Sequence, residues 1–191
     1  MQIGLFFGSF NPVHVGHMVL ANYMLSFTNL EQVWLVVSPH NPLKNKNQLL
    51  NQNDRLHLVK LAIDDHPAIR SSNIEFSLPQ PSYTIHTLAH LKEKHPEHQF
   101  SLIMGQDNLQ SFSKWKNYEE ILRQFRIYVY PRPNVALSEF DHHPNVQLTE
   151  APLMDISSTF IRTALKNKKD VRYFMPEKVW KEVDEMNFYR K

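Results

Sequence analysis

Short runs of apolar residues alternate along the chain with longer stretches in which apolar positions recur every three or four residues. The runs predict buried strands over residues 3–7, 33–37, 69–76, 100–104 and 126–130. Runs that are apolar throughout are typical of strands covered on both faces, as in a parallel sheet. The periodic stretches predict helices over residues 17–27, 52–65, 83–94, 118–125, 158–167 and 176–186. This alternation favours an α/β fold with a doubly wound parallel sheet.

The composition suits a single globular domain spanning residues 1–191, with a C-terminal helical subregion from about residue 150. Hydrophobic residues make up 42% and charged residues 21%, and the net charge is only +2. This balance gives no electrostatic reason to expect a nucleic-acid or membrane-surface partner. No leader pattern and no apolar run of membrane-spanning length is visible, so we expect a cytoplasmic protein. Because the chain has no cysteine, disulfides, thiol nucleophiles and Cys-ligated metals are excluded.

Glycine is scarce. The chain has four glycines in 191 residues, whereas an average protein of this length has roughly 7% glycine. They are Gly4, Gly8, Gly16 and Gly105. A chain so poor in glycine is expected to keep it where a side chain does not fit.

The first candidate site is the segment GSFNPVHVGH, residues 8–17, which follows the first predicted strand. Open parallel sheets bind ligands beyond the carboxyl ends of their strands. Gly8 lacks a Cβ and would let a nucleotide approach the backbone. His14 and His17 are three residues apart and lie on one face of a helix start, where imidazoles could donate hydrogen bonds to phosphate oxygens. The alternative is a strand–helix turn with two surface histidines.

The second candidate site is the segment MDISSTFIR, residues 154–162. Either Ser157 or Ser158 can cap the helix, and the N–H groups of a first helical turn bind anions. Arg162 lies four residues after Ser158, on the same face, and can add a forked contact to a phosphate. The alternative is an ordinary capped helix with a surface arginine.

Together the two segments resemble the signatures of the nucleotidylyltransferase superfamily. Residues 14–17 are similar to its HxGH motif, and residues 156–162 to its ISSTxIR motif. The resemblance implies a Rossmann-like parallel sheet and transfer of a nucleotidyl group from a nucleoside triphosphate. Asn11 stands where the family usually has Asp. We expect activity to be retained, because the family's chemistry rests on the two histidines.

Three further segments resemble one branch of this superfamily, the nicotinate mononucleotide adenylyltransferases. Residues 39–44 are similar to its PxxPxK loop, residues 81–88 to its PSYTxxTL segment, and residues 105–122 to its GxD…F..W..Y..IL region. Arg132 and Pro133 match a family RPG, in which Asn134 replaces the glycine. The resemblance covers residues 2 to about 188, essentially the whole chain.

This resemblance assigns the candidate residues. It implies that Asp107 binds the ATP ribose, that Trp115 stacks on the pyridine ring, and that the backbone at Tyr83 and Thr84 receives the nicotinate carboxylate. The residues implied in catalysis are His14, His17, Lys44 and Arg162. Those implied in ATP binding are Gly8, Ser9, Phe10, Gly16, His17, Gly105, Asp107, Ser157, Ser158, Thr159 and Arg162. Those implied in binding nicotinate mononucleotide are Asn41, Lys44, Tyr83, Thr84, Trp115, Lys116 and Arg132.

The implied reaction transfers the adenylyl group of ATP to nicotinate mononucleotide, giving nicotinate adenine dinucleotide and pyrophosphate in NAD biosynthesis. We expect Mg²⁺ to enter with ATP, no metal held by the protein alone, and no partner beyond the two substrates except a possible second copy of the chain. Other adenylyltransferases of the superfamily, acting on phosphopantetheine or the amide mononucleotide, and a non-catalytic nucleotide-binding regulator remain alternatives. Lys44 as a solvated lysine, Trp115 as a core aromatic and Asp107 as a helix cap also remain open.

Overall fold

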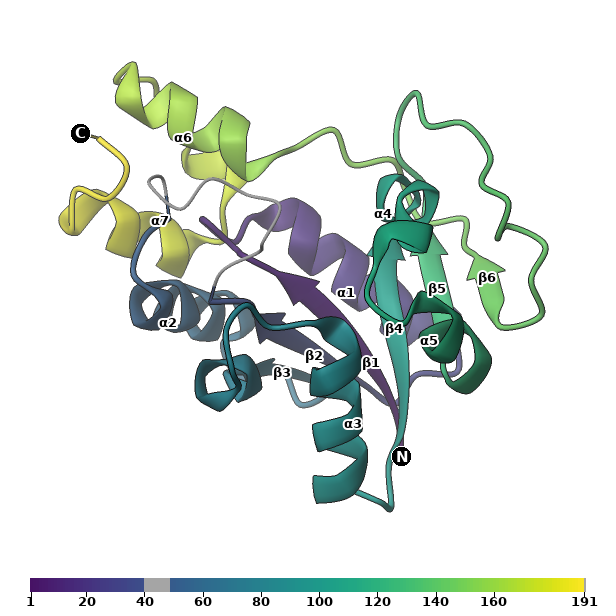
Figure 1. Cartoon of the computed structure of the whole chain (residues 1–191). Coiled ribbons are helices and arrows are strands. Elements are labelled where there is room, and N and C mark those ends of the chain that lie inside the picture. The colour runs from purple at the N-terminus through teal and green to yellow at the C-terminus, as the bar shows by residue number, and fades with distance from the viewer. Residues whose placement is uncertain (40–48, 191) are drawn as a thin grey trace.

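The structure is a computed structural model that describes residues 1–39 and 49–190. Its centre is a six-stranded sheet in which every neighbouring pair is parallel, with helices on both faces (Figure 1). The strand order is β3-β2-β1-β4-β5-β6. The strands are β1 (Gln2–Gly8), β2 (Gln32–Val37), β3 (Ile69–Ser72), β4 (Gln99–Gly105), β5 (Arg126–Tyr130) and β6 (Val146–Leu148). The predicted α/β fold with a doubly wound parallel sheet is confirmed.

Each face of the sheet carries its own apolar cluster. In β1, Phe6 packs with buried residues of four helices on one face, whereas Ile3 and Leu5 pack with three helices on the other. The first group is α1 (Val15–Phe27), α2 (Gln52–Ile63), α6 (Ser158–Lys166) and α7 (Glu177–Glu185). The second group is α3 (Thr84–Lys94), α4 (Gln106–Gln110) and α5 (Tyr118–Gln124). Burial on both faces is why the strand sequences are apolar throughout.

The chain starts in the middle of the sheet. From β1 it moves outward through β2 and β3, then returns to β4 beside β1 and moves outward in the other direction. The strand order therefore reverses between β1 and β4, where open α/β sheets form a crevice beyond the strand ends. Gly8 ends β1 and Gly105 ends β4. The loops that leave these two strands are the natural place for a ligand.

Most predicted elements agree with the structure to within one or two residues, but the third strand does not. β3 ends at Ser72, and Ile74–Ser77 form a short 3-10 helix instead of continuing the strand. That turn buries Glu75, which accepts a hydrogen bond of 2.8 Å from the Thr87 hydroxyl of α3. β6 and α4 were not predicted, and Pro176 precedes α7 rather than being its first residue.

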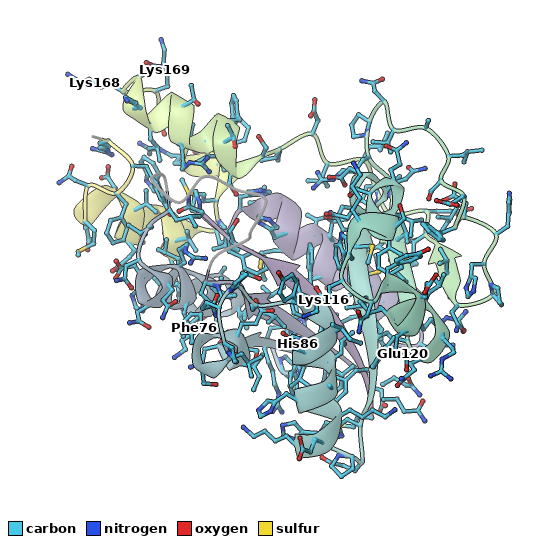
Figure 2. The ribbon with its side chains drawn as sticks, viewed as in Figure 1. Phe76, His86, Lys116, Glu120, Lys168 and Lys169 are labelled. Carbon is cyan, nitrogen blue, oxygen red and sulfur yellow. The ribbon has the colours of Figure 1, made fainter. Side chains whose placement is uncertain are left out.

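The end of α6 is a tight turn without glycine. Lys168 has a left-handed backbone with φ of 56°. Its N–H donates to Leu165 O over 2.9 Å, and the N–H of Lys169 donates to Ala164 O over 2.9 Å. This is the hydrogen-bond pattern with which helices commonly end, usually on a glycine. Figure 2 shows Lys168 and Lys169 at this exposed end of the molecule.

Candidate active site

Two imidazole rings lie against each other where α1 begins. His14 is the residue before the helix and His17 is in its first turn, and their ring centroids are 3.7 Å apart. The N–H of His14 donates to Nδ1 of His17 over 3.2 Å. Phe10 packs against this pair, because its buried ring meets the His17 ring edge-on with the centroids 5.0 Å apart. The two predicted histidines are therefore held together by the turn itself.

The hydrogen bond to Nδ1 sets the protonation pattern of His17. A nitrogen that accepts cannot carry the proton, so neutral His17 is protonated on Nε2. His14 is buried, with 5% of its surface exposed. Burial, and secondly the charge of Arg132, lowers the pKa of His14 from 6.5 to about 4. His14 is therefore neutral at neutral pH, and its ring offers one N–H.

Two glycines make room for this arrangement. A Cβ on Gly16 would lie 3.1 Å from Nδ1 and 3.2 Å from Cε1 of His14. A Cβ on Gly8 would lie 2.8 Å from the ring of Phe10. The sequence predicts open space beside the Gly8 backbone for a nucleotide. The ring of Phe10, which is buried in the core, fills that space instead. Gly4 differs, because a Cβ there would meet core side chains of Leu30 and Ile103.

The second motif is tied to the same loop. The Ser158 hydroxyl donates to Pro12 O over 2.8 Å, and Nη1 of Arg162 donates to Asn11 O over 2.8 Å. Ser157, not Ser158, is the helix cap, since its hydroxyl accepts from the Phe160 N–H over 3.1 Å. Nη2 of Arg162 also reaches Oγ1 of Thr159 at 3.3 Å. The start of α6 and the start of α1 therefore lie side by side.

The residues after β4 and β5 form a third part of the site. Oδ1 of Asp107 lies 3.5 Å from Nε of Arg132, whose guanidinium also lies over the ring of Tyr130 at 5.1 Å. The Tyr130 ring lies 5.8 Å from the ring of Phe6, which in turn lies 6.0 Å from that of His17, so this pair lies on the histidine side of the site. Gly105 is the residue before α4, so the alternative of Asp107 as the helix cap is wrong. A Cβ on Gly105 would lie 2.4 Å from Oδ1 of Asp107.

The remaining predicted residues gather at the start of α3. Tyr83 precedes the helix and Thr84 begins it, so the first N–H groups of α3 lie at this end of the sheet. Nζ of Lys116 lies 4.6 Å from the centroid of the Tyr83 ring, and Figure 2 labels Lys116 near α3. Trp115 is half-buried against Phe112, with ring centroids 5.4 Å apart. Two segments far apart in the sequence thus meet here.

Comparison with known proteins shows which family the chain belongs to. A family model described as cytidylyltransferase-like matches residues 5–164. A relative from Flavobacterium psychrophilum, named "probable nicotinate-nucleotide adenylyltransferase", is 55% identical over 193 residues that cover all of both chains. This chain belongs to the nicotinate-nucleotide adenylyltransferase family. A relative of the same name from Flavobacterium johnsoniae is 53% identical over 196 residues, again covering all of both chains.

Solved structures of the nicotinate-nucleotide adenylyltransferase kind share the fold. The Plasmodium falciparum nicotinic acid mononucleotide adenylyltransferase complexed with NaAD has a TM-score of 0.83 and 18% identity, covering 98% of this chain and 97% of that chain. The same enzyme complexed with APC has a TM-score of 0.81, 18% identity, and coverage of 98% of this chain and 96% of that chain.

The described part of the chain contains no helix long and apolar enough to cross a membrane.

The two residues that depart from the expected family signatures, Asn11 and Asn134, both lie in turns. Oδ1 of Asn11 accepts a hydrogen bond of 3.1 Å from the Leu50 N–H. Asn134 has φ of 59°. That left-handed conformation favours glycine, and asparagine is the side chain that tolerates it best. The turn after Arg132 therefore adopts a left-handed conformation without glycine.

Arg55 is a buried residue that joins the loops around the site, and its sequence pattern did not single it out. It is 1% exposed and donates to the carbonyl oxygens of Ser9 (2.6 Å), Ser38 (2.8 Å), Pro39 (2.9 Å) and Leu50 (2.9 Å). One guanidinium thereby joins the loops that leave β1 and β2 to the start of α2. The signal was its spacing, since Arg55 falls on the same helix face as the buried Leu58, Val59 and Ile63.

Two predicted residues, Asn41 and Lys44, lie outside the described residues. Among the described residues, the His/Glu grouping spaced for a metal ion is His95, Glu97 and His98. It follows α3 and precedes β4, at the amino end of the sheet and away from the histidine pair. There Nε2 of His98 lies 3.3 Å and Nδ1 of His95 lies 3.8 Å from Oε1 of Glu97, all within the loop between α3 and β4.

Proposed function

We propose that the protein transfers the adenylyl group of ATP to nicotinate mononucleotide, giving nicotinate adenine dinucleotide and pyrophosphate. A 5′-phosphate oxygen of the mononucleotide attacks the α-phosphorus of ATP in line, and the bond between that phosphorus and the bridging oxygen to the β-phosphate breaks. The observation that most supports this is the contact between the tilted rings of His14 and His17, next to the loop that Ser158 and Arg162 bind. The names of the relatives provide the substrate class.

Catalysis in this proposal is positioning and charge stabilisation. The attacking phosphate is already anionic, so the reaction needs no general base and no covalent nucleophile. Nε2–H of His17 and one N–H of His14 would donate to the α- and β-phosphate oxygens, where charge accumulates as pyrophosphate leaves. Their fixed contact at the start of α1 supports this role, because preorganised donors need little rearrangement during the reaction.

The triphosphate would be held from the α6 side. Ser157, Ser158 and Thr159 place the first N–H groups of this helix at the site, where the positive end of the helix dipole favours anions. Arg162 has N–H donors beyond the two used for Asn11 and Thr159, and its planar fork fits phosphate oxygens. Gly8, Ser9, Phe10 and Gly16 would contribute backbone, and Lys44 would act from its loop.

The nicotinate half would bind at the start of α3. The N–H groups at Tyr83 and Thr84 precede the first full helical turn and suit a carboxylate. Lys116 over the Tyr83 ring places a positive charge at the same point, which favours the acid over the neutral amide. Trp115 would stack on the pyridine ring. Asp107 would take the ATP ribose, and its ion pair with Arg132 would fix its orientation.

Magnesium enters this proposal as part of the substrate. The described groups around the histidine pair are mostly imidazole, guanidinium, hydroxyl and backbone N–H, which suit phosphate oxygens, and the carboxylate of Asp107 is paired with Arg132. Mg²⁺ bound to the phosphates keeps most of its own water and neutralises charge on the leaving pyrophosphate.

Pyrophosphate release by the purified protein tests the proposal. ATP is supplied with nicotinate mononucleotide, with nicotinamide mononucleotide, or with phosphopantetheine, each at the same concentration. We expect rapid release with the acid mononucleotide and slower release with the amide. Release chiefly with phosphopantetheine would assign the protein to another branch of the superfamily. ATP binding without release for any acceptor would indicate a regulator.

A further inference from the structure

A tight turn that joins α3 to β4 carries two histidines and a glutamate. The turn is the segment HPEH, residues 95–98. The His98 N–H donates to His95 O over 3.1 Å, and the His95 N–H donates to Leu91 O over 2.9 Å at the end of α3. Pro96 takes the second position of the turn, where its fixed φ is favoured. The backbone therefore brings the first and last residues of the turn, both histidines, close together.

The three side chains of this turn converge. Nε2 of His98 lies 3.3 Å and Nδ1 of His95 lies 3.8 Å from Oε1 of Glu97, and one ligand atom from each residue lies within 4.8 Å of the other two. Neighbouring ligands of a tetrahedral zinc ion are about 3.3–3.5 Å apart, because the bonds are about 2.0–2.2 Å long. Movements of about 1 Å or less in each side chain would therefore bring all three to bonding distance.

The surroundings hold the imidazoles and leave the carboxylate open to solvent. The His95 ring meets the Trp34 ring edge-on with the centroids 5.8 Å apart, and the His98 ring meets the Phe100 ring in the same way at 6.1 Å. Nδ1 of His98 is buried, so Nε2 is the nitrogen that this ring can offer to an ion. The Glu97 side chain is 61% exposed. An ion can thus enter from the side of the glutamate.

The donor set selects the kind of ion. Two imidazole nitrogens and one carboxylate oxygen are a ligand combination that zinc sites use, with water in the remaining position. Imidazole suits zinc, copper and nickel, whereas magnesium and calcium prefer oxygen ligands alone. The cluster therefore fits a first-row transition metal and does not fit the magnesium that accompanies ATP.

We propose that His95, Glu97 and His98 form a binding site for Zn²⁺. The site goes beyond adenylyl transfer and does not rest on it, because the turn lies at the amino end of the sheet, whereas the histidine pair follows the carboxyl end of β1. It also departs from the expectation that the protein alone holds no metal. Bound zinc would tie the end of α3 to the start of β4, and the fold would be stabilised by the binding.

The test is zinc binding by the full chain without nucleotide, measured by calorimetry in excess Mg²⁺. We expect His98→Gln and Glu97→Gln each to weaken zinc binding roughly tenfold or more, because even the loss of a residue that supports a ligand costs that much. Zinc should raise the unfolding temperature of the wild type and raise that of the two variants much less. Excess Mg²⁺ should not displace the zinc.

The matched control is His86→Gln. His86 is exposed and lies near the start of the same helix (Figure 2), one turn before His90, so it belongs to another pair of histidines with metal-like spacing. We expect this variant to bind zinc as the wild type does. Loss of zinc binding in His86→Gln, with none in the turn variants, would assign the ion to α3 and overturn the proposal.

Equal zinc affinity in the wild type, His98→Gln and Glu97→Gln would also overturn it, since the three side chains would then form ion pairs only. Pyrophosphate release with Mg²⁺ and ATP should be the same in the two variants as in the wild type, because neither residue belongs to the proposed active site. A wild type that binds zinc at this turn but releases no pyrophosphate would refute the proposed reaction and leave the metal site standing.

Discussion

The hydroxyl of Ser158 donates to the carbonyl oxygen of Pro12 over 2.8 Å, joining residues 146 positions apart in the sequence. This contact fixes the start of α6 against the turn that carries the two histidines. Phosphate groups bound by the start of α6 and by the histidine turn would therefore be held at a fixed position relative to each other. The distance between the donors of α6 and the imidazoles is set by the protein before ATP arrives, which lowers the entropy cost of aligning the triphosphate.

His17→Ala should lower kcat by about 100-fold or more, because it removes a donor to oxygens on which charge develops. Circular dichroism should remain unchanged, since His17 lies at the helix start and its ring is only half-buried. The measurement is steady-state pyrophosphate release at saturating substrates. Turnover near that of the wild type would remove His17 from the mechanism.

Gly16→Ala should impair ATP use more than folding. The added Cβ would lie 3.1 Å from Nδ1 of His14 and would push that ring by a few tenths of an ångström. We expect kcat/KM for ATP to fall about tenfold, since small misplacements of catalytic groups are costly. Alanine also favours helix by roughly 0.5–1 kcal/mol, so the melting temperature should be maintained. A variant that simply unfolds would contradict this interpretation.

Trp115→Ala should raise the KM for nicotinate mononucleotide and leave ATP binding nearly unchanged. The side chain is half-buried against Phe112 and next to Lys116, which faces Tyr83. Loss of one stacking contact is expected to raise this KM about 5- to 50-fold. The two KM values measured on the same preparation provide the internal control. An unchanged mononucleotide KM would assign Trp115 to packing alone.

The burial of His14 should make stability depend on pH. Its pKa is 6.5 when unfolded and about 4 in the fold. Between these values the unfolded chain binds a proton that the folded chain does not, so stability is full above pH 6.5 and falls as the pH drops toward 4. The loss is about 2–3 kcal/mol. The measurement is urea unfolding of the wild type and His14→Gln at pH 7 and pH 4.5. Between these pH values the wild type should lose more unfolding free energy than His14→Gln. An equal loss in the two proteins would show that His14 does not cause the pH dependence.

The sheet could be predicted because its strands are buried on both faces and read as plain apolar runs. Arg126–Tyr130 agrees with the predicted strand to the residue. The prediction was wrong past Ser72, where the apolar Ile74 and Phe76 belong to a turn that buries Glu75. β6 has only three residues, from Val146 to Leu148, too few to show any period. Short edge elements depend on their neighbours more than on their own sequence.

The motifs predicted that the two histidines and the start of α6 serve one phosphate site, but not the contacts that hold these segments together. Arg55 is charged, and a charged residue is normally expected at the surface. It is buried here because four carbonyls from distant loops converge on it, which no local pattern reveals. The roles assigned to individual site residues remain predictions.

The left-handed turn after α6 has a consequence for engineering a more heat-tolerant protein. Among the described residues, every position with positive φ is occupied by a residue other than glycine. Lys168 is exposed and follows the C-terminal end of α6, whereas the contacts with the histidine loop are made by Ser158 and Arg162, so its backbone can be relaxed without touching the chemistry. Lys168→Gly should raise the unfolding free energy by up to about 1 kcal/mol. Because this chain has residues other than glycine at its left-handed turn positions, a single substitution to glycine at such a position can raise its unfolding free energy.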